Sequence, residues 1–239
     1  MTEPPRTAAF GFVCAMPMEL VPLAEKLSLV EEQVGDATVH TGKLGGRDVV
    51  AIVTGMGPDY ARDGTTRLLD AFVVGHVVSV GITGAVENEV AIGTLLLPEI
   101  VVHRTAGTEH RPTRLGAGTP AGKMSTGGDL LTDRDAIAAL REDGVVALEM
   151  ETGAIAQVCE ARGVPWSVFR AVSDQPDDWD LTQEGFVLTN LDGTPNHEAI
   201  TRYFQEHPER AEQMARLAEN STLAAERAAQ AAIDACLHG

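Results

Sequence analysis

The segment Val145–Asp174, VVALEMETGAIAQVCEARGVPWSVFRAVSD, decides the fold of this chain of 239 residues. It contains an apolar run at Val145–Met150, a stretch with helical spacing at Thr152–Arg162, and a second apolar run at Trp166–Val172. Buried strands read as short apolar runs, whereas helices repeat apolar residues every three to four positions. The segment therefore predicts a strand, a helix and a second strand.

The same alternation extends toward the N-terminus. Further strands are predicted at Ala8–Ala15, Asp48–Thr54, His76–Ile82 and Thr94–His103, and helices at Met18–Lys26, Asp59–Val74 and Asp133–Arg141. Strands that alternate with helices build a largely parallel sheet with helices on its faces. We therefore expect one α/β domain over residues 1–239, with a central, mostly parallel mixed sheet.

Two regions interrupt this order. The polar stretch Arg104–Thr119 is expected to be a surface loop, and Pro176 with the acidic residues that follow it ends the strand–helix pattern. A longer helical C-terminal part, about 187–239, is then expected, with helices at His197–Glu206 and from about Glu209 to Ala235. Four apolar residues of the last helix are predicted to pack against the core: Met214, Leu217, Leu223 and Ile233.

The composition excludes several functions. With 18 Lys and Arg against 35 Asp and Glu, the net charge of -17 repels a phosphate backbone, so we exclude nucleic-acid binding. The apolar run Thr94–Val102 is broken by Pro98 and Glu99 and falls short of the ~20 residues that cross a bilayer. No signal peptide is expected from the polar start of the chain, Met1–Ala8.

The cysteines indicate a reducing compartment. Cys14, Cys159 and Cys236 are odd in number and far apart, and they form neither a disulfide framework nor a C-x-x-C pair. A cytoplasmic location is therefore expected.

Polar residues follow the predicted strands, where ligands collect in open α/β sheets. Glu19 comes after the first strand, and Glu151 and Asp174 follow the two strands of Val145–Asp174. Each has a structural interpretation: Glu19 as a solvated residue of a first helical turn, Glu151 as a helix N-terminal carboxylate, and Asp174 as an N-cap.

Two linked motifs favour a functional interpretation. E-M-E-T-G-A-I-A at Glu149–Ala156, followed by R-A-V-S-D at Arg170–Asp174, resembles the purine nucleoside phosphorylase superfamily, in particular its hydrolytic branch, the 5'-methylthioadenosine/S-adenosylhomocysteine nucleosidases. Further matches lie at Ala15–Glu19, Gly55–Gly57, Gly81–Ala85 and Ser125–Asp129, so the resemblance covers residues 8 to about 186. It implies a three-layer α/β/α fold, a homodimer, and neither a metal nor an organic cofactor.

The resemblance also implies a role for each matching residue. Asp174 would protonate N7 of the purine as general acid, with Ser173 orienting it, and Glu19 would deprotonate the attacking water with help from Arg170. Glu151 would accept hydrogen bonds from the ribose 2'- and 3'-hydroxyls. The remaining substrate-binding positions it implies are Met150 under the sugar, Glu149, Thr83, Gly84 and Leu131.

The chemistry requires these residue types. Cleavage of an N-glycosidic bond develops positive charge on the sugar and negative charge on the base, so carboxylates near the ribose and a proton donor near the purine stabilise the transition state. Burial should raise the pKa of Asp174 enough for it to act as an acid. The loop Cys14–Glu19 has neither arginine nor glycine to hold phosphate, and Glu19 would repel it, which favours hydrolysis over phosphorolysis.

Departures from the family pattern leave the substrate open. The chain has Ile82-Thr83-Gly84 where these nucleosidases have Ser-Ala-Gly, so Thr83 is the candidate replacement for the lost hydroxyl. The part from Val187 onward does not match. Methylthioadenosine, S-adenosylhomocysteine, futalosine-type nucleosides and adenosylated lipids remain candidates, with adenine or a 6-oxopurine as base. A phosphorylase or a non-catalytic nucleoside-binding protein is the alternative.

Other polar groups predict no metal site. His103 and His110 are expected in a loop, and the cluster Asp177, Asp178 and Asp180 is expected to be a solvated acidic turn because it lacks the glycine and terminal glutamate of a calcium loop. Gly55–Gly57 lacks the third glycine of a dinucleotide fingerprint and predicts a tight strand–helix turn near the ligand.

Overall fold

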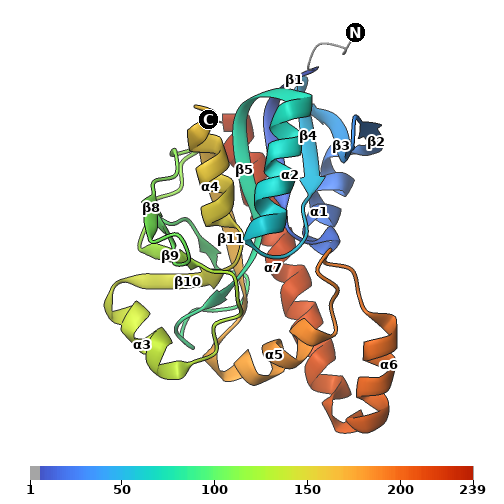
Figure 1. Ribbon diagram of the computed structural model, residues 1–239, viewed down its shortest axis with the longest axis vertical. Helices are drawn as coiled ribbons and strands as arrows, with labels where there is room; N and C mark the ends of the chain where they lie inside the picture. The colour runs from blue at the N-terminus through green and yellow to red at the C-terminus, as the bar shows by residue number, and fades with distance from the viewer. Residues whose placement is uncertain (1–5, 239) are drawn as a thin grey trace.

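A computed structural model describes residues 6–238 of the chain; residues 1–5, part of the start on which no signal peptide is expected, lie outside the described residues. Figure 1 shows the arrangement of the elements. The strands are β1 (Arg6–Cys14), β2 (Val30–Val34), β3 (Ala37–Leu44), β4 (Arg47–Val53), β5 (Phe72–Ala85), β6 (Leu95–Leu96), β7 (Ile100–His103), β8 (Thr108–His110), β9 (Lys123–Thr126), β10 (Val145–Glu149) and β11 (Trp166–Asp174). The helices are α1 (Pro17–Leu27), α2 (Pro58–Ala71), α3 (Arg134–Glu142), α4 (Thr152–Ala161), α5 (Trp179–Val187), α6 (His197–Glu206) and α7 (Ala211–His238), with 3-10 turns η1 (Pro176–Asp178) and η2 (Pro208–Arg210).

The strands form one mixed sheet in the order β2-β3-β4-β1-β5-β10-β9-β7-β8, with β11 beside β5 and β6 beside β11. β1 runs parallel to β4 and β5, and β11 runs parallel to β5. β9 runs parallel to β10 and β7. The end of β5 pairs antiparallel with β10 through Gly84 and Ala85. The long strand β5 is therefore shared by two parts of the sheet, and its C-terminal end lies between β11 and β10.

Helices cover both faces of the sheet, as expected for three layers. On one face α2 and α4 contribute Leu68 and Ile155 to a cluster that also holds Trp166. On the other face α1 and α7 pack together and against β11 and β5. The side chains that α7 buries there are mostly alanine, which lets a helix approach a sheet closely. The chain is a single α/β domain.

Three expected boundaries are wrong. The predicted strand Thr94–His103 is two short strands, β6 paired with β11 and β7 paired with β9, because Pro98 between them cannot donate to a ladder. The expected loop Arg104–Thr119 contains β8, which forms a hairpin with β7. The predicted helix Asp59–Val74 ends at Ala71, since Phe72 turns to extended backbone and starts β5.

Four elements have no counterpart among the expected ones: β2, β3, β9 and α5. β2 and β3 form the edge of the sheet and carry a mixture of exposed and buried residues, so they have no continuous apolar run. α5 starts inside the acidic cluster that was expected to be a turn.

The C-terminal helices extend the molecule below the sheet (Figure 1). α6 buries no residue fully, and a small cluster around Leu181, Leu188 and Met214 joins α5, α6 and the start of α7. Met214, Leu217 and Ile233 pack as predicted, whereas the prediction for Leu223 is wrong because this residue is 39% exposed.

The connection between α5 and α6 returns to the sheet. The backbone N–H of Met56 donates to the Leu191 carbonyl at 2.7 Å. The α-carbon of Gly193 lies so close to Met16 that an added Cβ would approach it to 2.9 Å. This connection therefore covers the loops that follow β1 and β4.

Candidate functional site

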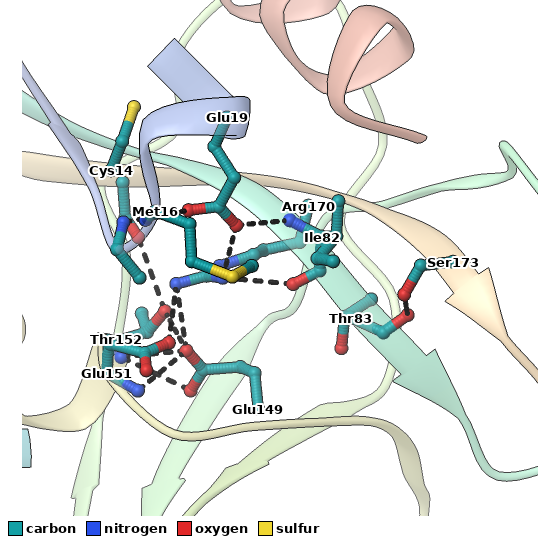
Figure 2. Close-up of polar contacts among 12 residues, drawn as sticks. Cys14, Met16, Glu19, Ile82, Thr83, Glu149, Glu151, Thr152, Arg170 and Ser173 are labelled. Atoms are coloured by element: carbon teal, nitrogen blue, oxygen red, sulfur yellow. Dashed lines mark hydrogen bonds and ion pairs between the residues drawn. The ribbon is translucent and has the colours of Figure 1, made fainter. Parts of the chain in front are cut away.

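The loops and strand ends at the C-terminal edge of the sheet bring together the acidic residues singled out in the sequence. Figure 2 shows Glu19 facing Arg170 from one side, with Glu149 and Glu151 on the other side of the guanidinium. These four side chains come from α1, β11, β10 and the start of α4. Chain segments more than 60 residues apart thus contribute to one charged cluster.

Glu19 is fully buried, at 0% exposure, so its interpretation as a solvated helix residue is wrong. It is the third residue of α1 and reaches back to accept hydrogen bonds from the backbone N–H groups of Ala15 at 2.8 Å and Met16 at 3.0 Å through Oε2. Its Oε1 accepts from the Ile82 N–H at 2.9 Å. The carboxylate is therefore fixed between the β1–α1 loop and β5.

Gly81 makes room for this carboxylate. A Cβ at Gly81 would lie 2.1 Å from Oε1 of Glu19 and 2.9 Å from Nη1 of Arg170. Real Cβ atoms do not approach heavy atoms that closely, so Glu19 and Arg170 can adopt these positions only beside a glycine.

Arg170 is 2% exposed and neutralises the cluster. Its guanidinium lies 3.0 Å from Glu149, 3.4 Å from Glu151 and 3.5 Å from Glu19, and Nη1 donates to the Ile82 carbonyl at 2.9 Å. Burial alone would lower the pKa of Arg170, but the surrounding carboxylates outweigh burial and raise it, so the guanidinium stays charged. One cation thus faces three carboxylates.

Glu149 and Glu151 differ in what they contact. Glu149 caps α4: its Oε2 accepts from the N–H groups of Glu151 and Thr152, both at 2.9 Å, and from the Thr152 hydroxyl. Oε1 of Glu151 accepts from the Gly57 N–H at 2.7 Å, which confirms the tight strand–helix turn expected at Gly55–Gly57 beside the site. Burial, reinforced by Glu149 and Glu19 and opposed by Arg170, raises the pKa of Glu151 to about 7.

Asp174 lies at the end of β11 and is 8% exposed. The pairing of β11 with β5 shifts register there, from Val172 opposite Thr83 to Asp174 opposite Gly84, so Ser173 is an extra residue. Adjacent side chains of a regular strand point to opposite faces, whereas a bulge re-aims one of them. The Ser173 hydroxyl can therefore donate to Oδ1 of its neighbour Asp174 at 2.6 Å.

The surroundings of Asp174 favour its protonated form. Burial raises the pKa of Asp174, and the nearby carboxylate of Asp178 adds to the effect, while hydrogen bonds from Ser173 and Thr182 oppose it. The pKa therefore moves in the direction that a general acid near neutral pH needs.

A pocket open to solvent lies beside these residues. It contains five of the residues that sequence analysis assigned to the site, namely Gly84, Leu131, Glu149, Met150 and Asp174. It is also lined by residues that sequence analysis did not assign: Arg104, Asp129, Leu130, Thr132, Leu148 and Thr182. Asp129 ends the quoted S-T-G-G-D motif and Arg104 follows a predicted strand end, so both carried a signal, whereas Thr182 lies on the unpredicted helix α5.

Thr83 is buried, and its hydroxyl donates to the Leu148 carbonyl at 2.8 Å. A hydroxyl has one proton to donate. The proton of Thr83 is therefore engaged with β10.

The histidines and the acidic cluster lie in different surroundings from those expected. His103 and His110 are buried on the β7–β8 hairpin and not in a loop, and Nδ1 of His110 lies 2.8 Å from Glu160. Asp178 is buried and ion-paired to Arg216, so the expectation of a fully solvated turn is wrong for it. Within residues 6–238, no group of three or more His, Cys, Asp or Glu side chains could hold a metal ion, and no helix is long and apolar enough to span a membrane.

Known proteins resemble this chain in sequence and in fold. The model of the "Phosphorylase superfamily" matches residues 9–122 and 116–234. A "5'-methylthioadenosine/S-adenosylhomocysteine nucleosidase" of Actinobacillus succinogenes is 30% identical over 197 residues, covering 70% of this chain and 86% of that protein.

Solved structures share the fold at lower identity. The nucleosidase of the same description from Neisseria meningitidis, in complex with methylthio-immucillin-A, superposes with a TM-score of 0.72 at 19% identity and covers 97% of this chain and 99% of its own. The futalosine hydrolase of Helicobacter pylori superposes with a TM-score of 0.67 at 18% identity, covering 94% of each chain. Because the family model matches most of the chain and a nucleosidase is 30% identical to it, this chain belongs to the phosphorylase superfamily.

Proposed function

We propose that this protein is a purine nucleoside hydrolase that cleaves the N-glycosidic bond of a 5'-modified adenosine, of the methylthioadenosine or S-adenosylhomocysteine type. The observation that carries the proposal is that Glu19 and Asp174 both contact the C-terminal end of β5, two residues apart. Glu19 accepts from the N–H of Ile82, and Oδ2 of Asp174 lies over Gly84, 3.1 Å from where a Cβ would be. A nucleoside bound there would have a base for water on one side and an acid for the purine on the other.

In this mechanism Asp174 donates its proton to N7 as the bond between N9 and C1' lengthens. The departing purine then leaves as a neutral base, which lowers the barrier. The sugar becomes oxocarbenium-like, and its positive charge is stabilised by the carboxylates of Glu151 and Glu19. Met150, which lines the pocket, lies under the ribose, and Glu151 accepts hydrogen bonds from the 2'- and 3'-hydroxyls.

Glu19 activates the water that attacks C1'. Both acceptor positions of its Oε2 are used by Ala15 and Met16, whereas Oε1 accepts one hydrogen bond from the residues that the structure describes, that of the Ile82 N–H, and keeps one position. The water therefore binds Oε1. The guanidinium of Arg170 lies 3.5 Å from Oε1 on the β5 side of the carboxylate. A phosphate dianion at this place would meet three carboxylates for one guanidinium, which favours water as the nucleophile.

Variants of the two carboxylates test the proposal. Asp174→Asn and Glu19→Gln should each lower turnover by around 10² or more. Thermal unfolding of Asp174→Asn should stay close to wild type, whereas Glu19→Gln should also lose about 1.5–3 kcal/mol of stability, because its amide nitrogen replaces an oxygen that accepts backbone hydrogen bonds. The assay follows free base and sugar product by chromatography, with and without phosphate, over a panel of adenine and hypoxanthine nucleosides. An active Asn variant rejects the acid assignment, and a ribose 1-phosphate product rejects hydrolysis.

A 6-oxopurine nucleoside is the second candidate, because of Arg104. This side chain lines the pocket with Asp174, and its Nε is buried without a hydrogen-bond partner among the described residues. Arginine only donates, so it can pair with the O6 acceptor of a 6-oxopurine, whereas the N6 amino group of adenine is a donor. Preference for inosine-type nucleosides in the same panel, lost in Arg104→Met, would favour this candidate.

We further propose a cytoplasmic homodimer without a metal or organic cofactor. The three cysteines are buried and free, which suits a reducing compartment. Light scattering coupled to gel filtration tests the dimer, and activity that survives chelation by EDTA tests the absence of a metal.

A further inference from the structure

An ion pair lies behind the proposed acid, outside the pocket. Asp178 ends η1 and is 8% exposed, and its Oδ1 lies 3.0 Å from Nη2 of Arg216 on α7. The Arg216 side chain is 60% exposed, so the pair has a buried anionic end and a solvated cationic end. It connects the C-terminal helix to the segment that follows Asp174.

Thr182 links this pair to the acid. Its hydroxyl lies 3.1 Å from the Asp178 carbonyl and 3.4 Å from Oδ2 of Asp174. One hydroxyl has one proton, and the shorter contact takes it. The Thr182 hydroxyl therefore donates only weakly to Oδ2 of Asp174.

The other oxygen of Asp174 has a different partner. Ser173 donates to Oδ1 at 2.6 Å, so a proton on Oδ1 would compete with that donor. The two hydroxyls together favour protonation at Oδ2, the oxygen that lies over Gly84 in the pocket.

The charges around Asp174 come from several elements. Glu149 on β10, Asp129 in the β9–α3 loop and Arg104 after β7 line the same pocket, while Asp178 on η1 and Arg216 on α7 pair with each other and are not among the lining residues. The ligand covers the first three when it binds. The Asp178–Arg216 pair does not line the pocket, so a bound substrate would leave these two charges in place.

We propose that Asp178 and Arg216 are positioning residues. They set the proton affinity of the Asp174 carboxylate and determine which of its two oxygens carries the proton. The anionic end of the pair disfavours a second negative charge on Asp174, and Arg216 limits this effect by neutralising Asp178. The Asp178 carbonyl orients Thr182, so the same segment also directs the proton. This inference rests on the proposed function, since it gives meaning to Asp174 as an acid.

Opposite shifts of the pH profile test the inference. In Asp178→Asn the proton on Asp174 should be released more easily, so the basic limb of kcat/KM should move to lower pH. In Arg216→Gln the uncompensated Asp178 should move the same limb to higher pH. Each shift should be roughly half a unit to one unit for charges at this range in a partly buried setting.

Control variants separate these shifts from damage to the fold. Arg216→Lys keeps the charge and should keep the profile, and Arg202→Gln breaks an exposed helical pair with Glu198 at 2.7 Å and should also leave it unchanged. Arg216→Gln should fold, since the side chain is mostly solvated, and thermal unfolding checks this.

The outcomes distinguish the inference from the proposed function. If Asp174→Asn is fully active, the proposed acid is wrong and the inference fails with it. If Asp174→Asn is inactive but both pair variants keep the wild-type profile, or shift it in the same direction, only the inference is overturned. Opposite shifts with Asp174→Asn inactive support both.

Discussion

Replacing Gly81 by alanine should disable the site through one misplaced methyl group. The added Cβ would lie 2.1 Å from Oε1 and 2.6 Å from Cδ of Glu19. A carbon and an oxygen need about 3.2–3.5 Å, so the carboxylate must retreat by roughly 1 Å. Its hydrogen bond from Ile82, now 2.9 Å long, would then be lost.

The expected size of the effect follows from this displacement. A misplacement of 1 Å can cost about 10²-fold in rate, and losing a hydrogen bond to a charged group costs about 1.5–3 kcal/mol. We therefore expect Gly81→Ala to lower kcat/KM for purine release by around 10² and the free energy of unfolding by about 2 kcal/mol. Steady-state release of base and denaturant-induced unfolding measure the two quantities.

A matched control and a second variant make the test specific. Gly185→Ala, on α5, would place its Cβ in ordinary contact with Leu217 at 3.6 Å, and should leave both quantities unchanged. Glu19→Asp shortens the side chain by one methylene, so adding Gly81→Ala to that variant should cost less than it does in wild type, because only the 2.9 Å approach to Nη1 of Arg170 remains. The reasoning is refuted if Gly81→Ala keeps wild-type kcat/KM, or if its cost is the same in the Glu19→Asp background.

Three further outcomes are expected. The folded-state pKa of Glu151 is about 7, above its ordinary value. The contribution of Glu151 to the free energy of unfolding is therefore fully present below about pH 4.5 and is lost as the pH rises through 7. Glu151→Gln should remove about 3 kcal/mol of this pH dependence, measured from urea unfolding curves at several pH values. Thr83→Val removes the donor to the Leu148 carbonyl and should lower the unfolding free energy by about 1–3 kcal/mol, with kcat within a few-fold of wild type; a 10²-fold loss of kcat would instead place Thr83 at the water. Arg170→Met leaves buried carboxylates unpaired and should cost about 3–5 kcal/mol of stability at pH 8, a loss that acidification should reduce in calorimetry.

The sequence predicted the central strands and helices well because their patterns are strong. Val145–Met150 and Trp166–Val172 are nearly continuous apolar runs, and the structure places β10 and β11 there. β2 at Val30–Val34 could not be found this way, because an edge strand with mostly exposed residues has no apolar run to detect. A strand whose position is set by pairing with its neighbours, and not by burial of its own side chains, has no clear hydrophobic pattern in its sequence.

The candidate site was predictable in part, because several of its residues lie in strong sequence motifs. Glu19, Glu151 and Asp174 lie beside motif residues, so the resemblance identified them, and the structure brings Glu19 and Glu151 to the same arginine. Thr182 carried no signal, since α5 begins in an acidic stretch that reads as a turn. Its approach to Asp174 depends on tertiary packing alone.

The extra residue at Ser173 has a consequence for how this activity could arise or disappear. Deleting one residue from β11 would restore an uninterrupted ladder with β5 and leave the apolar pattern of Trp166–Val172 intact. The chain could still fold, yet the aspartate would no longer have the serine hydroxyl on its own side. A one-residue deletion that leaves the core residues unchanged would thereby remove the serine contact to the proposed acid.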